Sequence, residues 1–233
     1  IKGLSKVRSA REANRLAAIA MMLAAFGVLL NSQGTIGISI NSWIWIICGT
    51  FIGGLLGAFT AKKVPMTAMP EIVALFNGCG GMSSLLVALG VALFPSSEGS
   101  DGVVSDLVKN FSIVVSLFVG AITFSGSIVA MAKLQGWLST PHWTQSKARH
   151  FFNIICAVVV LIGGTSLSID GQNGLFIVLV ASSLLGIGVT LPIGGADMPV
   201  VISLLNSYSG VAAAAAGFVV GSQLLIVAGA MVG

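Results

Sequence analysis

This sequence of 233 residues has little charge, a single tyrosine and few cysteines. Only 8% of its residues are Asp, Glu, Lys or Arg, whereas a soluble domain carries about 25%. The composition therefore excludes an ordinary water-soluble domain. The three cysteines, Cys48, Cys79 and Cys156, lie in apolar runs without metal-ligand spacing. We expect them to be buried small hydrophobes with no redox or zinc role.

Nucleotide and metal motifs are also missing. No G-x-G-x-x-G, Walker A or H-E-x-x-H pattern occurs. The segment Gly78-Cys79-Gly80-Gly81 lies inside an apolar run, where a Rossmann turn could not form. We therefore expect this chain to bind no nucleotide cofactor, metal or nucleic acid by itself.

Long apolar runs dominate what is present, since 56% of the residues are hydrophobic and the mean hydropathy is +1.04. A helix that crosses a bilayer needs about 20 mainly apolar residues. Seven complete runs and the start of an eighth meet this description, at about 13–30, 41–61, 69–94, 106–132, 149–169, 173–191, 198–220 and 224–233. The runs do not alternate in polarity, which excludes a β-barrel. The prediction is an all-α polytopic transmembrane helical bundle that forms one domain over residues 1–233.

The basic residues predict the topology of this bundle. Alternating the spans puts ten of the eleven Lys and Arg residues at one face, with Lys109 as the exception. By the positive-inside bias this face is cytoplasmic, or the matrix face in a mitochondrion. The last run stops without a polar flank, so we expect the chain to be cut there. A segment that followed Gly233 would emerge on the basic face.

Small and polar residues recur at helical spacing in two of the runs. Gly49, Gly53 and Gly57 follow the small-xxx-small spacing that lets two helices approach closely in lipid. A polar stripe shares one helical face and therefore meets protein or water, and it consists of Ser112, Ser116, Gly120, Thr123 and Ser127. The pattern fits hydroxyls that bond to the carbonyl four residues back in their own helix, and it fits hydroxyls that line water equally well.

A short parallel repeat marks two of the spans. Met69-Pro70 precedes Asn77 as Met198-Pro199 precedes Asn206. Each asparagine would lie about 12 Å in from its helix start, and Ser127 about 8 Å in from the inward end of its own span. These three polar side chains therefore share a level, where unpaired amides would be costly. A hydrogen bond between helices and a file of water are both open readings. Asp197 adjoins the second copy, and capping of the helix by its carboxylate would explain it.

Several segments together resemble a known family. They are 69–75, 120–127, 133–136, 193–200 and 206–210, which read MPEIVAL, GAITFSGS, KLQG, IGGADMPV and NSYSG. They are similar to the membrane domain of the beta subunit of proton-translocating NAD(P) transhydrogenase, and the similarity runs from about Gly3 to Gly233.

The resemblance implies the membrane part of an enzyme that transfers a hydride from NADH to NADP+ while protons move inward. NAD(H) would bind a domain of the alpha subunit, and NADP(H) a domain that follows Gly233 on the inner face. This chain would then bind no cofactor and hold no catalytic residue for hydride transfer. It would lie in a bacterial inner membrane or the mitochondrial inner membrane, within a dimer of alpha-beta units.

The resemblance also implies roles for single residues. Asn206 matches an asparagine associated with proton conduction, Ser127 a serine on the neighbouring channel helix, and Asp197 an acidic residue near the NADP domain. Asn77 departs from the pattern, because some members carry a histidine there and asparagine does not titrate. We therefore expect the alpha subunit to supply the titrating histidine, with Asn77, Ser127 and Asn206 holding a water file.

Two other classes of function stay open on the residues alone. The proline-asparagine repeat also fits a secondary transporter or channel for a small solute. A scaffold bundle would hold no water file.

Overall fold

The computed structural model describes residues 7–35, 40–94 and 106–233. Every regular element in this part of the chain is a helix, and the all-α prediction is confirmed for it. The α-helices are α1 (Val7–Thr35), α2 (Ile40–Lys63), α3 (Met69–Leu93), α4 (Asp106–Leu134), α5 (Ala148–Thr190), α6 (Met198–Val220) and α7 (Gln223–Val232). Three short 3-10 turns accompany them, namely η1 (Met66–Ala68), η2 (His142–Gln145) and η3 (Gly195–Asp197).

Six segments of the described chain are long and apolar enough to cross a membrane. They are Ile40–Lys63, Met66–Leu93, Leu107–Leu134, Ala148–Leu167, Asn173–Thr190 and Gly195–Val220. The expected first span, 13–30, lies within α1, which is not among the six, and it includes residues whose side chains lie outside the described set. Helix α7 has 10 residues, too few for a complete span. The seven complete spans and the start of an eighth are therefore not confirmed, whereas the polytopic helical class is.

The chain divides into two compact units, 1–63 and 64–233. Among the described residues of the first unit, the close packing predicted for Gly49, Gly53 and Gly57 does not occur. Nothing among the described residues lies within 4 Å of where a side chain would begin at any of the three. The reason is that no residue of α2 is buried against other helices.

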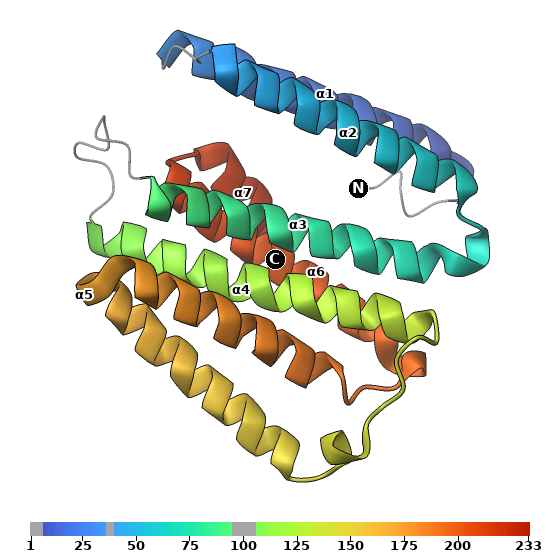
Figure 1. The fold of residues 1–233 in the computed structure, drawn as a ribbon. Helices are drawn as coiled ribbons and strands as arrows, with labels where there is room; N and C mark the ends of the chain where they lie inside the picture. Colours follow the sequence, from blue (N-terminus) through green and yellow to red (C-terminus); the bar gives the residue numbers. More distant parts are fainter. Residues whose placement is uncertain (1–6, 36–39, 95–105) are drawn as a thin grey trace. The chain divides into compact units, whose positions relative to one another are not determined.

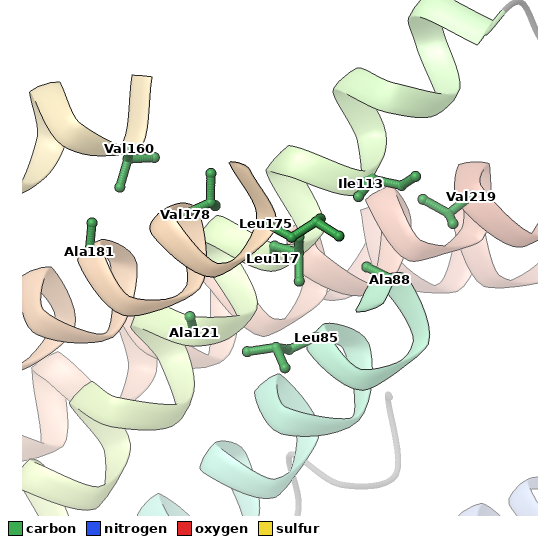
Figure 2. Packing of buried hydrophobic residues seen from close by; sticks show 10 residues of the cluster. All are labelled: Leu85, Ala88, Ile113, Leu117, Ala121, Val160, Leu175, Val178, Ala181 and Val219. Carbon is green, nitrogen blue, oxygen red and sulfur yellow. The ribbon is translucent and has the colours of Figure 1, made fainter. Parts of the chain in front are cut away.

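Helix α4 is the centre of the second unit. It contacts α3, α5 and α6, and 61% of the residues in its most apolar stretch are buried inside the protein. Figure 1 shows α3 and part of α5 on either side of it. The core that holds these four helices together is shown in Figure 2 and consists of Leu85, Ala88, Ile113, Leu117, Ala121, Val160, Leu175, Val178, Ala181 and Val219.

Helix α5 folds back on itself, so that its two halves form the two spans expected at 149–169 and 173–191 (Figure 1). A β-carbon at Gly174 would lie 2.7 Å from the backbone nitrogen of Leu167, and one at Gly188 would meet the ring of Phe152. In a straight helix the second pair would be about 50 Å apart. The two halves therefore run antiparallel and pack through glycine.

Glycine also brings the backbones of α3 and α4 together. A β-carbon at Gly120 would lie 2.8 Å from the carbonyl oxygen of Gly81, and one at Gly81 would lie 2.9 Å from the β-carbon of Thr123. Such contacts leave no room for larger residues. They hold the polar face of α4 directly against α3.

The cysteines correct one sequence expectation. Cys156 is buried, but Cys48 and Cys79 are exposed on the chain surface, and all three are free thiols. The burial predicted for Cys48 and Cys79 was wrong, because a membrane helix is apolar on its outward face as well as its inward face.

Candidate functional site

Helices α3 and α6 begin in the same way. A 3-10 turn precedes each, and a proline lies in each first turn, where the missing N–H costs nothing. The residues before the two helices also share a backbone conformation, with φ −94° and ψ 8° at Ala68 and φ −92° and ψ −2° at Asp197. The repeat seen in the sequence is thus also a repeat of local structure.

Three polar side chains meet in the interior, one from each of α3, α4 and α6. The amide nitrogen of Asn77 donates to the hydroxyl of Ser127 over 3.0 Å. The hydroxyl of Ser209 donates to the amide oxygen of Asn77 over 2.7 Å. Ser127 is fully buried and Asn77 is 8% exposed. We call Asn77, Ser127 and Ser209 the polar triad.

Asn206 is not a member of the triad. Its side chain is exposed on the surface of this chain, although it aligns with Asn77 in the sequence repeat. Ser209 supplies the contact from α6 instead. The segment NSYSG includes Ser209, but sequence analysis gave this residue no role. The available signal was the spacing of Ser209 from Asn206, because residues three apart lie on neighbouring parts of one helical face.

The polar stripe of α4 faces the protein interior along its whole length. Ser112, Ser116, Gly120, Thr123 and Ser127 are all buried. The hydroxyl of Ser116 lies 3.2 Å from the carbonyl oxygens of both Ser84 and Ala212, so it links α4 to α3 and α6. Within the described chain, the Thr123 hydroxyl is buried and has no hydrogen-bond partner. The stripe therefore continues the polar triad along the helix.

Asp197 lies at the start of α6, but its carboxylate does not cap the helix. Its side chain makes no capping hydrogen bond and is exposed. The predicted capping role is therefore wrong. The backbone gives the reason, because Asp197 already has a helical conformation, whereas a capping side chain needs an extended one. The carboxylate is left free for another contact.

The triad can relay hydrogen bonds but cannot itself take up a charge. Its members are an amide and two hydroxyls, which offer donors and acceptors without titrating near neutral pH. The described residues contain no group of three or more His, Cys, Asp or Glu that could hold a metal ion. A proton carried past this site would need water or a titrating group from elsewhere.

Residues 1–233 match the family described as NAD(P) transhydrogenase beta subunit. The chain belongs to this family. It is also 40% identical, over 237 aligned residues, to the NAD(P) transhydrogenase subunit beta of Rhodospirillum rubrum and to the protein of that name from a designated strain of the same bacterium.

These beta subunits are longer than the chain. The alignment covers 100% of this chain and 49% of each relative, so the chain spans about half of their length. Membership of the transhydrogenase beta subunit family agrees with the resemblance found in the sequence, and nothing in these comparisons supports a solute transporter.

Proposed function

We propose that this chain is the proton-translocating membrane part of an NAD(P) transhydrogenase. It couples inward proton movement to the transfer of a hydride from NADH to NADP+ in soluble domains outside this chain. Membership of the beta subunit family supports the reaction. The observation that supports the route is the buried polar triad, which joins α3, α4 and α6 through Asn77.

The chemistry of the triad fits a neutral relay. A polar group that stays unpaired in hydrocarbon costs several kcal/mol, so membrane helices keep such groups only where they are paired or wet. Asn77 uses its oxygen and one amide hydrogen within the triad, and its amide has a second hydrogen to donate. That hydrogen is available to water, and a proton can pass along such water without a titrating residue in this chain.

The exposed amide of Asn206 supports a partner subunit as the source of the titrating group. Its amide is exposed on the surface of this chain although α6 is a candidate membrane span. Lipid would leave this amide unpaired. We propose that an alpha-subunit helix covers it and brings a histidine that carries the charge. Asn77, Ser127 and Asn206 then form the predicted proton pathway, and Ser209 joins it.

The proposed topology places this pathway between two faces. The membrane domain has seven complete spans and the start of an eighth, with its basic loops on the cytoplasmic or matrix side. The NADP(H) domain lies on that side, where Asp197 transmits its state to the channel. Alpha-beta units pair as a dimer, NAD(H) and NADP(H) bind outside this chain, and hydride transfer uses no residue of it.

The test of the proton route is Asn77→Leu in the complete alpha-beta complex, reconstituted into lipid vesicles. We expect transhydrogenation to lose its linked proton movement, measured with a pH-sensitive dye inside the vesicles, while NADP(H) binding persists. Asn110→Leu is the matched control, because Asn110 is an exposed asparagine on α4. Unchanged proton movement in Asn77→Leu would remove the triad from the route.

The proposed role of Asp197 has its own test. Asp197→Asn keeps the size of this exposed side chain but removes its charge. We expect both the affinity for NADP(H) and the ratio of protons moved to hydrides transferred to change. By linkage the proton gradient and NADP(H) binding must influence each other in both directions. A variant with wild-type affinity and a wild-type ratio would exclude this role.

A further inference from the structure

Lys133 is a charged side chain in the interior of the second unit. It lies in the last turn of α4 and is 8% exposed, and it is the one charged residue among the buried side chains of the described chain. Its ammonium group donates to the carbonyl oxygen of Ile193 over 2.7 Å and to the hydroxyl of Thr140 over 2.9 Å. A third hydrogen bond goes to the carbonyl oxygen of Leu191.

These three bonds use the full donor capacity of the group, because a lysine ammonium has three hydrogens and no acceptor. Leu191 follows the last residue of α5, where carbonyl groups lack helical partners and carry the negative end of the helix dipole. A positive charge is stabilised at this position. The contacts therefore form a complete site for an ammonium group.

The bonds connect segments that are far apart in the sequence. Leu191 and Ile193 are 58 and 60 residues from Lys133, and they belong to the connection between α5 and α6. That connection continues into η3, which ends at Asp197. Met198, the next residue, is fully buried and belongs to an apolar cluster with Ala130 of α4. Lys133 thus holds the segment that carries Asp197 against the end of α4.

The same helix carries a member of the polar triad. Ser127 precedes Lys133 by six residues, which is about 9 Å along a helix. A shift of the connection between α5 and α6 relative to α4 would also move α6, and with it Ser209. The ammonium site therefore joins the segment that leads to Asp197 to the helix that carries Ser127.

We propose that Lys133 is a positioning residue for energy coupling, which fixes the Asp197 segment in register with the proton pathway of α4. This inference rests on the proposed function. Lys133 neither carries the proton nor touches a nucleotide. It transmits the position of the segment next to the NADP(H) domain to the helix that holds Ser127.

The main test is Lys133→Met in the complete alpha-beta complex in lipid vesicles. Methionine keeps an unbranched apolar stem but cannot donate to the three oxygens. We expect an assembled complex in which the ratio of protons moved to hydrides transferred falls and the NADP(H) dissociation constant changes about fivefold or more, the range of ordinary coupling energies. Lys147→Met is the matched control, because Lys147 is an exposed lysine near the same end of the bundle.

Two milder variants keep the test decisive if methionine prevents assembly. Thr140→Val removes one acceptor and leaves the charge, so we expect a smaller change in the same direction. Lys133→Arg keeps the charge, but a planar guanidinium cannot converge on three oxygens as an ammonium does. We expect reduced coupling there too. Full coupling in Lys133→Arg together with unchanged coupling in Thr140→Val would overturn the proposal, as would an assembled Lys133→Met complex with the wild-type ratio and affinity.

The Asn77→Leu variant, measured in parallel, separates this inference from the proposed function. If Asn77→Leu abolishes proton movement and Lys133→Met behaves as wild type, the positioning role alone fails. If Asn77→Leu moves protons normally, the proposed route fails. A combined Lys133→Met and Asp197→Asn variant adds one more criterion. Effects on NADP(H) affinity that do not add support a shared path, whereas strictly additive effects contradict it.

Discussion

The Ser209 hydroxyl lies 2.7 Å from the amide oxygen of Asn77, and this bond joins α6 to α3 inside the bundle. The sequence repeat pairs Asn77 with a different residue of α6, Asn206. Ser209 follows Asn206 by three positions, which leaves the two side chains about 60° apart around the helix axis at 3.6 residues per turn. This rotation is enough to put one side chain inside and the other on the surface.

The first prediction concerns this bond. Ser209→Ala removes a donor from Asn77, and we expect the free energy of unfolding to fall by about 1 kcal/mol, the usual net worth of a hydrogen bond. Proton movement linked to hydride transfer should also slow. Thermal unfolding in detergent and dye measurements in vesicles test the two effects. Ser203→Ala is the control on the exposed face of α6, and an equal loss in both variants would contradict a special role for Ser209.

The second prediction separates stability from function at Asn206. Because its side chain is exposed on this chain, Asn206→Leu should change the free energy of unfolding of the membrane domain by less than about 0.5 kcal/mol. The same variant should abolish proton movement in the complete complex. Asn77→Leu should lower both quantities, because its amide is buried and paired. A large loss of stability in Asn206→Leu would show that this residue packs inside the domain.

The sequence was a good guide to where helices begin and a poor guide to which face is buried. Met69 and Met198, each followed by proline, are the first residues of α3 and α6. Local chemistry decides this, because proline fits the first turn and disfavours a helical residue before it. In a soluble protein the apolar stripe would also give the buried face. Here Leu204 is 51% exposed and its neighbour Leu205 is 3% exposed, since lipid and core both accept leucine.

Contacts between distant segments were the second feature that the sequence could not predict. Sequence analysis placed Lys133 among the basic residues at one face of the membrane and gave it no contact that would set it apart from the exposed Lys147. Its acceptors are backbone carbonyls at Leu191 and Ile193, and a carbonyl carries no signature in a sequence. The sequence did predict that the polar stripe of α4 meets protein or water, because its residues recur at helical spacing.

The third prediction concerns Ser116, whose hydroxyl bridges the carbonyls of Ser84 and Ala212. Ser116→Ala should destabilise the bundle by about 1 kcal/mol, because the bond links three helices. Ser183→Ala is the matched control, since the Ser183 hydroxyl donates to Leu179 within its own helix. That change should cost little, because such a bond does not support tertiary packing. Thermal unfolding of the two variants in one detergent compares them, and equal midpoints would contradict the prediction.

The last prediction uses two adjacent glycines of α3. A β-carbon at Gly81 would lie 2.9 Å from the β-carbon of Thr123 and 3.0 Å from the Gly120 carbonyl oxygen, whereas no atom of the described residues lies within 4 Å of the same position at Gly80. Gly81→Ala must therefore push α3 away from α4. We expect it to destabilise the domain by about 1–3 kcal/mol, as overpacking does.

Gly80→Ala should be neutral or stabilising by up to about 1 kcal/mol, because alanine is the better helix former. The difference between the variants isolates the contact between α3 and α4 from helix propensity, which changes equally in both. The separation forced by Gly81→Ala would also lengthen the bond from Asn77 to Ser127, which lies one helical turn away on the same pair of helices. Proton movement should therefore fall in Gly81→Ala and persist in Gly80→Ala. Equal stability and equal proton movement in the two variants would mean that this glycine contact does not set the geometry of the triad.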